Sequence, residues 1–196
     1  MIYKDKIFKD GDLKGQDFSK DQFENCKFIN TNLRFTSFTK CNFKTCDLSS
    51  IIFDTTSFFS CKFPESKLSN LDFSEVKIKN MDFSKAVMKN CVFQQLKSGS
   101  KNERKKFILS DCKFKKANLS GTIFFLCELA GVSFDMADLG NAVFDKCNLK
   151  DADLSGANIN GANFVDTKIE NTVLDLESFI VFGNSKGFIL EQQKPS

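Results

Sequence analysis

The 196-residue sequence contains no histidine and no tryptophan, and it has only one tyrosine and two prolines. Without histidine it lacks the side chain that most often serves as a general base or a metal ligand. It also contains no phosphate-binding glycine loop, no nucleophile motif and no CxxC pair. Aspartate and glutamate are frequent, but their positions predict no cleft that would shift their pKa values. The sequence therefore predicts a protein that is not an enzyme and that holds no cofactor and no metal.

Long hydrophobic runs are absent as well. No stretch approaches the roughly 20 consecutive apolar residues of a membrane-spanning helix. Residues 1–5 do not start the apolar core of a signal peptide. Pro64 is the only proline between residues 6 and 174, which suits a backbone whose N–H groups pair between neighbouring strands. We therefore expect a cytoplasmic protein that makes no membrane contact.

The sequence does contain a large apolar residue at every fifth position. From Phe8 to Phe93, and again from Phe114 to Leu174, all 31 of these central residues are Phe, Leu, Ile or Met. Side chains alternate faces along a strand and recur about every 3.6 residues on a helix, so neither element puts every fifth residue on one face. The chain must turn once per repeat and wind around a ladder of central side chains. Members of this predicted core ladder include Phe28, Leu48, Phe73, Phe124, Phe144 and Phe164.

A second regular position lies two residues before each centre and mostly holds Ala, Cys, Ser or Thr. All eight cysteines occupy it. A small side chain is expected there, because it points inward beside a bulky central residue. We interpret the cysteines as reduced thiols that fill space. The alternative is a disulfide or metal site, since pairs such as Cys26 and Cys46 would lie at matching places in neighbouring coils.

Several repeats share a more specific motif. Residues 117–121, 152–156 and 157–161 read A(D/N)(L/I)xG, and this motif resembles the pentapeptide-repeat family over about residues 6–174. The resemblance implies an all-β fold, a right-handed quadrilateral parallel β-helix with four repeats in each coil. The repeats then make about eight coils. Few corners before residue 94 carry glycine, which predicts different turn types in the two halves.

We expect one domain over residues 1–196. N-terminal coils span 1–93, a projecting loop spans 94–108, C-terminal coils span 109–174, and a cap and tail span 175–196. The interval from Phe93 to Phe114 is one residue longer than a full coil, and we expect the coil to resume near Phe107 and Leu109. The loop is either a solvated insertion or a partner-contacting element, and its basic residues are Lys97, Lys101, Arg104, Lys105 and Lys106.

The five-residue spacing ends at Leu174. Asp175 is a suitable N-cap for a short helix that ends near Gly183. The last coil of a stacked rod needs a cap, and the same apolar segment could also join two copies in a homodimer. The residues predicted to form this cap or dimer contact are Leu176, Phe179, Ile180, Phe182 and Phe188.

Charge is unevenly distributed along the chain. The net charge is +3, but residues 1–108 hold 20 basic and 13 acidic side chains, and residues 117–177 hold 3 basic and 10 acidic ones. We interpret the second region either as an ordinary solvated surface or as an acidic wall that meets a basic partner. Nucleic-acid binding is not expected, because acidic residues interleave with the basic ones and the aromatic residues point inward. The acidic wall comprises Asp135, Asp138, Asp145, Asp151, Asp153 and Asp166.

Some bulky apolar residues fall on outward positions of the repeat. Scattered apolar side chains are ordinary on a protein surface, whereas a cluster would indicate a contact patch. The sequence does not show whether these residues share a face. They are Phe35, Ile52, Phe59, Phe125 and Leu126.

Three features are similar to the Qnr-type, quinolone-resistance members of the family. The length is comparable, residues 108–114 re-enter the repeat after a mid-rod loop, and an apolar tail follows Leu174. This resemblance implies a DNA mimic that binds DNA gyrase or topoisomerase IV, protects it from antibiotics and dimerises through its tail. The net charge of +3 and the basic loop depart from that pattern. The alternative function is a generic protein-interaction scaffold of unknown partner.

Overall fold

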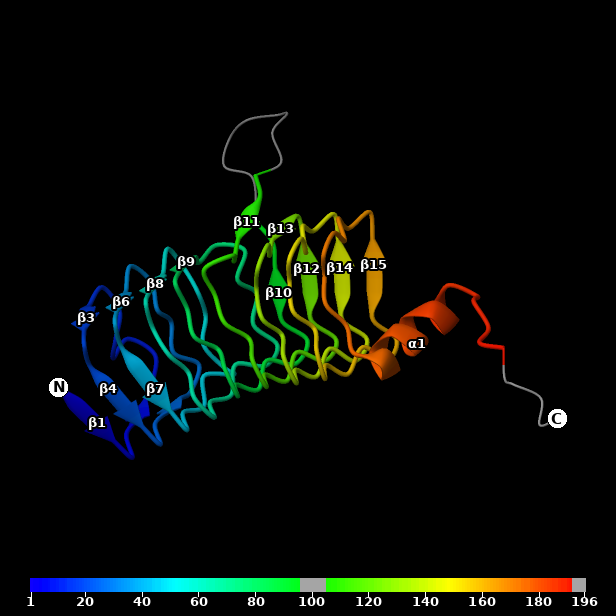
Figure 1. Ribbon diagram of the computed structural model, residues 1–196. Helices are drawn as coiled ribbons and strands as arrows, with labels where there is room; N and C mark the ends of the chain where they lie inside the picture. The colour runs from blue at the N-terminus through cyan, green and yellow to red at the C-terminus, as the bar shows by residue number, and fades with distance from the viewer. Residues whose placement is uncertain (96–104, 192–196) are drawn as a thin grey trace.

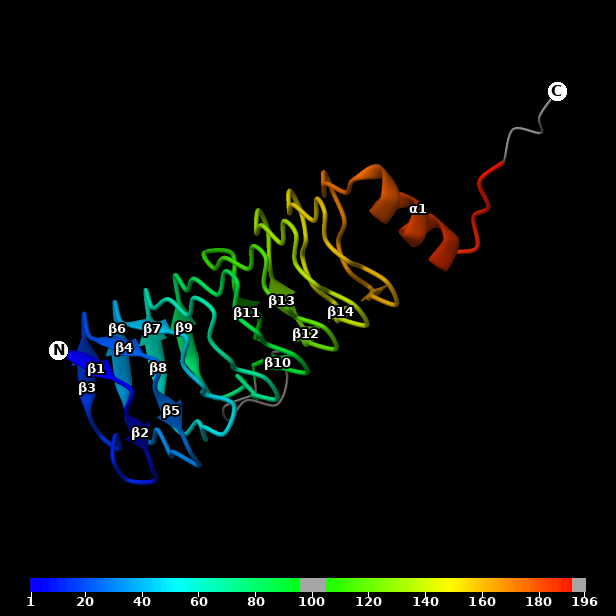
Figure 2. The same cartoon turned by 90° about the horizontal axis from the view of Figure 1, so that it is seen from below.

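The chain forms a rod of stacked coils. The computed structural model describes residues 1–95 and 105–191. Successive coils follow one another along the rod, and the two ends of the chain lie at opposite ends of it (Figure 1). Seen from below, the coils are arranged side by side and the helix α1 lies beyond the last of them (Figure 2).

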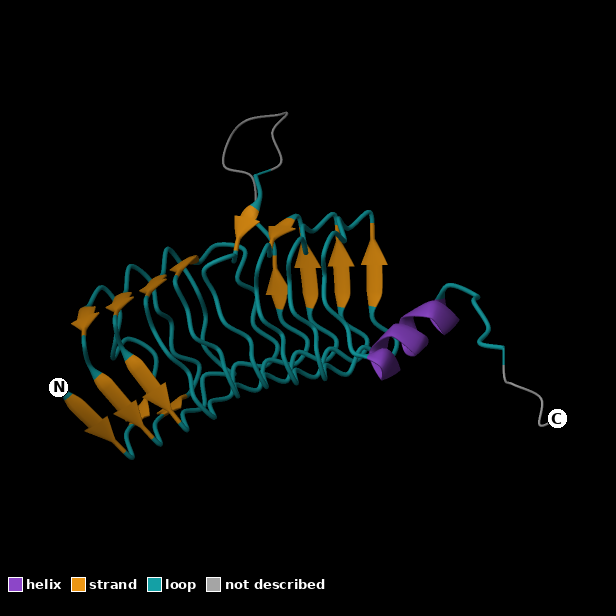
Figure 3. Cartoon of the chain, viewed as in Figure 1, coloured by secondary structure: helices purple, strands orange, loops and turns teal. Residues whose placement is uncertain are grey.

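The strands are only two or three residues long, so much of the wall between them is drawn as loop and turn (Figure 3). Before the insertion they are β1 (Ile2–Lys4), β2 (Ile7–Phe8), β3 (Asp17–Ser19), β4 (Gln22–Glu24), β5 (Lys27–Phe28), β6 (Ser37–Thr39), β7 (Asn42–Lys44), β8 (Ser57–Phe59), β9 (Lys77–Lys79) and β10 (Val92–Phe93). After it they are β11 (Phe107–Ile108), β12 (Ile123–Phe125), β13 (Cys127–Glu128), β14 (Val143–Asp145) and β15 (Asn163–Val165).

All pairing between these strands is parallel and joins successive coils. Phe18 of β3 pairs with Phe38 of β6, and Phe38 pairs with Phe58 of β8. Four five-residue repeats therefore complete each coil, and a central residue meets the central residue one coil further on. The predicted quadrilateral parallel β-helix of about eight coils is confirmed.

We name the four sides of the rod faces A to D, in the order in which the chain passes them. Central residues of face A are Phe23, Phe43, Phe63, Phe83, Phe114, Phe134 and Leu154, and those of face B are Phe28, Leu48, Leu68, Met88, Leu119, Leu139 and Ile159. Those of face C are Leu33, Phe53, Phe73, Phe93, Phe124, Phe144 and Phe164, and those of face D are Phe38, Phe58, Ile78, Leu109, Leu129, Leu149 and Ile169.

Aromatic rings stack along each face and meet edge to face across the core between different faces. The ring centroids of Phe23 and Phe43 are 4.6 Å apart with planes 4° from parallel. Phe114 and Phe124, on faces A and C, are 6.1 Å apart and nearly perpendicular at 84°. Both arrangements are favourable for aromatic pairs, so the ladder forms a dry core. Of the predicted core ladder, the partly buried member is Phe164 of the last coil, and the buried members are Phe28, Leu48, Phe73, Phe124 and Phe144.

The interruption of the repeat is longer than its spacing indicates. Val92 and Phe93 pair with Ile123 and Phe124, at a sequence separation of 31 instead of the usual 20. The inserted segment therefore has the length of two repeats plus one residue. In contrast, β11 pairs with β13 at the ordinary spacing of one coil. Leu109 is fully buried and is the next central residue after Phe93. A single repeat is therefore lengthened, and the coil resumes at Phe107 and Leu109 as expected, which places Phe107 within the predicted loop 94–108.

Corners in both halves use left-handed backbone geometry. Asn25 and Thr45 have φ values of 50° and 55°, and Lys146 has 55°, close to the 69° of Gly121. Non-glycine residues adopt this region at some cost, with Asn among the best tolerated. Pairing between coils holds them there, so the expected difference between the two halves was wrong in this respect.

The helix α1 (Leu176–Ser185) follows the last coil. Within residues 1–95 and 105–191 it is the only helix, and its ten residues are too few to cross a membrane.

Candidate protein-binding surfaces

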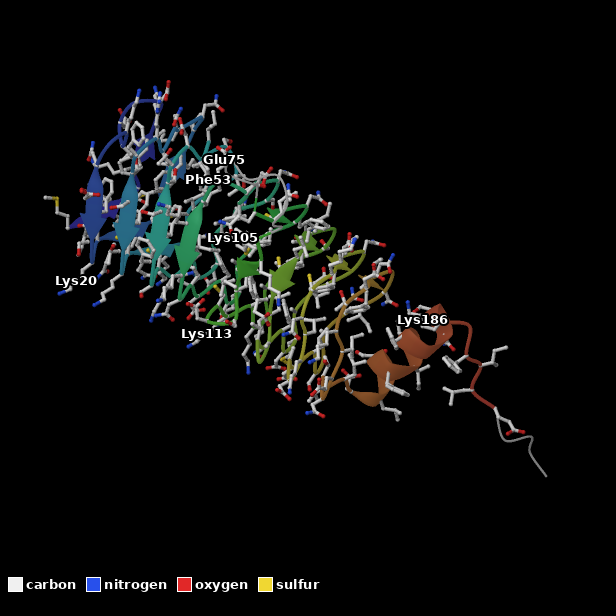
Figure 4. All side chains as sticks on the ribbon, turned by 90° about the horizontal axis from the view of Figure 1, so that it is seen from above. Lys20, Phe53, Glu75, Lys105, Lys113 and Lys186 are labelled. Atoms are coloured by element: carbon white, nitrogen blue, oxygen red, sulfur yellow. The ribbon has the colours of Figure 1, made fainter. Side chains whose placement is uncertain are left out.

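The predicted basic loop is described only at its end. Lys97, Lys101 and Arg104 lie outside the described residues. Lys105 and Lys106 are exposed, and Lys105 lies near the middle of the rod (Figure 4). The Lys106 ammonium lies 3.1 Å from a carboxylate oxygen of Glu128, which anchors the end of the insertion to face D of the following coil.

The predicted acidic wall is divided among four faces. Asp135 and Asp153 flank central residues of face A, and Asp138 flanks one of face B. Asp145 and Asp166 belong to face C, whereas Asp151 lies at a corner of face D. Consecutive residues of the chain turn a corner every five positions, so an acidic segment of sequence does not become an acidic side of the rod.

Several of these carboxylates already have partners. The Lys115 ammonium lies 2.5 Å from Asp135, and this hydrogen bond raises the pKa of Lys115. Lys146 lies 3.6 Å from Asp145. Hydrogen bonds from the Ser155 side chain and backbone lower the pKa of Asp153. The charge on this half is therefore mixed and locally compensated.

The start of α1 is fixed to the last coil by Asp175. Its carboxylate accepts hydrogen bonds from the backbone N–H of Ser178 at 2.8 Å and of Gly156 at 2.6 Å. These bonds, the one from Ser178 first, lower the pKa of Asp175. Ser178 is buried and its hydroxyl donates to the Ala157 carbonyl at 3.1 Å. The predicted N-cap is thus present and also ties the helix to the β-helix.

The predicted cap and dimer residues separate into two groups. Phe182 packs edge to face on Phe164, with ring centroids 5.8 Å apart, and so covers the end of the core. Leu176, Phe179 and Phe188 are 76%, 63% and 74% exposed. Together with the partly buried Ile180 they line an apolar groove of about 410 Å³ between α1 and the tail. Phe179 and Phe182 also line a cavity with Phe164 at the end of the core, so α1 both caps the rod and presents apolar side chains to solvent.

Face C carries an apolar surface that the linear sequence does not reveal. On the sheet of β10, β12, β14 and β15, the outward residues Val92, Ile123 and Val143 lie in register in three successive coils. Phe125 and Val165 flank them on the other side of the central column. Ile123 and Val165 are about 40% exposed, at 41% and 40%. We call these five residues the face C strip.

The bulky outward residues from the sequence belong mostly to the same face. Phe35, Ile52, Phe125 and Leu126 all lie in face C repeats, and only Phe59 lies on face D. Phe35 and Ile52 are 57% and 54% exposed. Residues on one face recur every 20 positions, or 31 across the insertion, and this spacing is the signal that links them.

The eight cysteines are free and buried. Burial raises the pKa of Cys46, Cys91 and Cys112 to about 12. The thiol of Cys46 also donates to the Phe23 carbonyl one coil away, at 3.3 Å. These three thiols are therefore protonated at neutral pH, and the described residues contain no His, Cys, Asp and Glu cluster suited to a metal.

The parallel pairing at a separation of 20 residues makes this chain a parallel β-solenoid with four repeats per coil. The family model for pentapeptide repeats matches eight copies, over residues 17–54, 108–145 and 137–175. The chain belongs to the pentapeptide-repeat family. A comparison with curated protein sequences found no match.

Solved structures of the same fold cover much of the chain at low identity. QnrB1, a plasmid-mediated fluoroquinolone resistance protein, is 17% identical over 98% of this chain and 99% of its own, with a TM-score of 0.47. HetL, from the cyanobacterium Nostoc, a protein involved in heterocyst differentiation regulation, is 16% identical over 88% and 90%, with a TM-score of 0.38. A pentapeptide repeat protein from the thylakoid lumen of Arabidopsis thaliana is 21% identical over 72% and 73%, with a TM-score of 0.24.

Proposed function

We propose that this chain is a non-enzymatic, single-domain rod that binds a partner protein through its side. The observation that carries this proposal is the face C strip, an apolar surface on a sheet that is otherwise flanked by polar residues. Ile123 and Val165 are exposed and the other three residues are partly buried, with Asp145 between Phe125 and Val165. Apolar surface residues grouped among polar ones are typical of protein–protein contact sites. The strip lies on paired strands rather than on a loop, so binding orders little of the chain.

Two copies of the rod are proposed to associate through α1. Leu176 and Phe179 of α1 and Phe188 of the tail that follows it are exposed. An isologous contact would bury this groove against its copy and leave the sides of both rods free. Replacement of Phe179 by Asp is expected to give a monomer in light scattering coupled to size exclusion. A dimer that persists in this variant would contradict the contact.

The finer hypothesis is a DNA mimic that protects DNA gyrase or topoisomerase IV. The acidic excess of residues 117–177 favours it. A mimic needs a continuous negative surface, however, and the six aspartates lie on four faces beside lysines. We therefore place the scaffold first. A gyrase supercoiling assay with a quinolone distinguishes the two hypotheses. If the purified rod rescues or inhibits supercoiling, the DNA-mimic hypothesis is favoured over the scaffold.

Site-specific photo-crosslinking tests the scaffold. A photoreactive phenylalanine analogue replaces Ile123 in one variant and Asn118 in the other. Both residues precede a central residue, but Ile123 lies on face C and Asn118 on face B. We expect a discrete adduct with one protein in cell extract from position 123 and none from position 118. Equal adducts from both positions, or none from either, would remove face C as the binding surface.

A further inference from the structure

We infer that face C takes a basic, apolar segment of its partner protein, with an arginine or lysine a few residues from apolar side chains. This inference rests on the proposed binding role of face C and adds the chemistry of the bound segment. Three properties of the face support it: its charge, its cation-bearing rings and a cleft at one end of it.

The charge of face C is negative. Among the described residues, its outward positions hold twice as many acidic as basic side chains. The basic ones are Lys14, Arg34 and Lys146, and the acidic ones are Asp12, Asp54, Asp72, Glu75, Asp145 and Asp166. Two of the basic groups are engaged on the face itself, because Arg34 lies 3.2 Å from Asp54 and Lys146 lies 3.6 Å from Asp145. The face therefore has negative charge to offer to a cationic partner.

Aromatic rings on face C already hold cations. The Arg34 guanidinium lies over the ring of Phe35, 4.9 Å from its centroid. The Lys146 ammonium lies over the ring of Phe125 at 5.8 Å. An aromatic face attracts a cation electrostatically, and the attraction grows when the site loses water. Both arrangements show that cationic side chains fit the outer surface of this face.

A cleft at the N-terminal side of face C combines apolar and acidic walls. It has a volume of about 340 Å³ and is lined by Ile52, Asp72 and Glu75 among others. Ser74 holds Asp72 in place, since its backbone N–H donates to Asp72 at 2.9 Å. A lysine or arginine could lay its methylene stem on Ile52 and bring its charged end to the carboxylates. Glu75 and Phe53 lie together on one side of the rod, away from Lys113 (Figure 4).

The distance from the cleft to the face C strip sets the spacing within the bound segment. Asp72 pairs with Val92, the first residue of the strip, and Val92 pairs with Ile123, so two coils separate the carboxylate from Ile123, the first exposed residue of the strip. At the usual sheet spacing of about 4.8 Å, this distance is roughly 10 Å. An extended chain covers that distance in about three residues. The partner segment therefore carries its cation about three residues from its apolar side chains.

Peptide binding to the full-length protein tests this inference. The probe is a fluorescein-labelled, end-capped peptide with one arginine and, three residues on, a leucine–phenylalanine pair. Its two controls replace the arginine by glutamate or the apolar pair by serines. We expect fluorescence anisotropy to show binding of the probe that weakens with added salt, and at least tenfold weaker binding of each control. Equal binding of the glutamate peptide, or no binding of the probe up to millimolar protein, would overturn the inference.

Matched variants locate the binding. Asp72→Asn combined with Glu75→Gln is expected to weaken probe binding at least tenfold. Asp82→Asn is the control, because Asp82 accepts a bond from the Ser84 N–H at 3.0 Å in the same geometry but on face A. An equal effect of both variants would overturn the inference. So would protection of face C by a second copy of the rod in crosslinking from position 123. If position 123 crosslinks to a partner protein but the probe does not bind, the proposed scaffold function stands and only the basic chemistry of the bound segment is rejected.

Discussion

Alanine at two corner glycines should have different costs, although their backbone is the same. Gly121 and Gly131 both have a φ of 69°. A Cβ built on Gly131 meets nothing within 4 Å, whereas one on Gly121 would lie 2.3 Å from the side-chain oxygen of Asn90. Left-handed geometry costs an alanine about 1 kcal/mol at either site. Only Gly121→Ala must also move Asn90, the corner residue of the preceding coil.

The additional cost at Gly121 can be worked out from what Asn90 loses. Its side-chain amide donates to the Asn70 oxygen at 3.4 Å, and a new Cβ would displace that side chain. A weak hydrogen bond and a rotamer change together are worth about 1 kcal/mol. We therefore expect Gly131→Ala to lower the free energy of unfolding by about 1 kcal/mol and Gly121→Ala by about 2 kcal/mol.

Urea unfolding followed by circular dichroism measures both values. A double-mutant cycle isolates the contact: in an Asn90→Ala background, Gly121→Ala should cost no more than Gly131→Ala does in the original protein. Equal destabilisation by the two single variants would refute the reasoning. So would an unchanged cost of Gly121→Ala in the Asn90→Ala background, since the side chain that it is said to displace would then be absent.

Three further predictions concern the core, the cap and the thiols. Phe124→Ala opens a cavity in the ring stack and should lower the free energy of unfolding by about 3–5 kcal/mol, against under about 1 kcal/mol for the outward Phe125→Ala, both measured in urea. The pKa of Asp175 is lower in the folded protein than in the unfolded chain. Its carboxylate therefore stabilises the fold above the unfolded pKa of about 3.9, and this stabilisation is lost as the pH falls through the lower folded value. Asp175→Asn should remove this part of the pH dependence of thermal unfolding, and an identical profile in the variant would contradict the N-cap. All eight buried thiols should react with a thiol reagent at pH 8 only after denaturation, and rapid labelling of several in the native protein would contradict a dry core.

The sequence predicted the coil because its signal is local and physical. A centre that is always large and apolar, with a small residue two positions earlier, requires the chain to turn once per repeat. The four repeats in each coil were implied by the resemblance to the pentapeptide-repeat family. Asp175 likewise predicted the N-cap, since capping depends on a few adjacent residues. The return of the coil near Phe107 and Leu109 could also be predicted, because apolar residues reappear there after a polar stretch. The pairing of Phe93 with Phe124 could not be predicted, because central residues recur every five positions on all four faces.

The candidate surface could not be found by reading neighbouring residues together. Ile123 and Phe125 share a face with Val143 and Val165, whereas Asp135 and Asp138, which lie between them in the sequence, point to faces A and B. A count of charge along residues 117–177 therefore sums four different surfaces. The insertion adds a further obstacle, because the step of one ordinary coil from Val92 leads to the buried Cys112 instead of Ile123.

The charge and polarity of each face of the rod are thus set by residues that recur once per coil along the long axis of the rod. A single substitution changes one step of a face and leaves the other three faces untouched. For a partner that binds along face C, affinity depends on several coils at once, and the loss of Asp72 and the loss of Ile123 should act on different parts of the same bound segment. Their effects on binding should then add in free energy, because two coils separate them and they share no contact. Mimicry of DNA would instead make all acidic faces contribute together, and neutralising Asp135 on face A would weaken binding as much as neutralising Asp166 on face C.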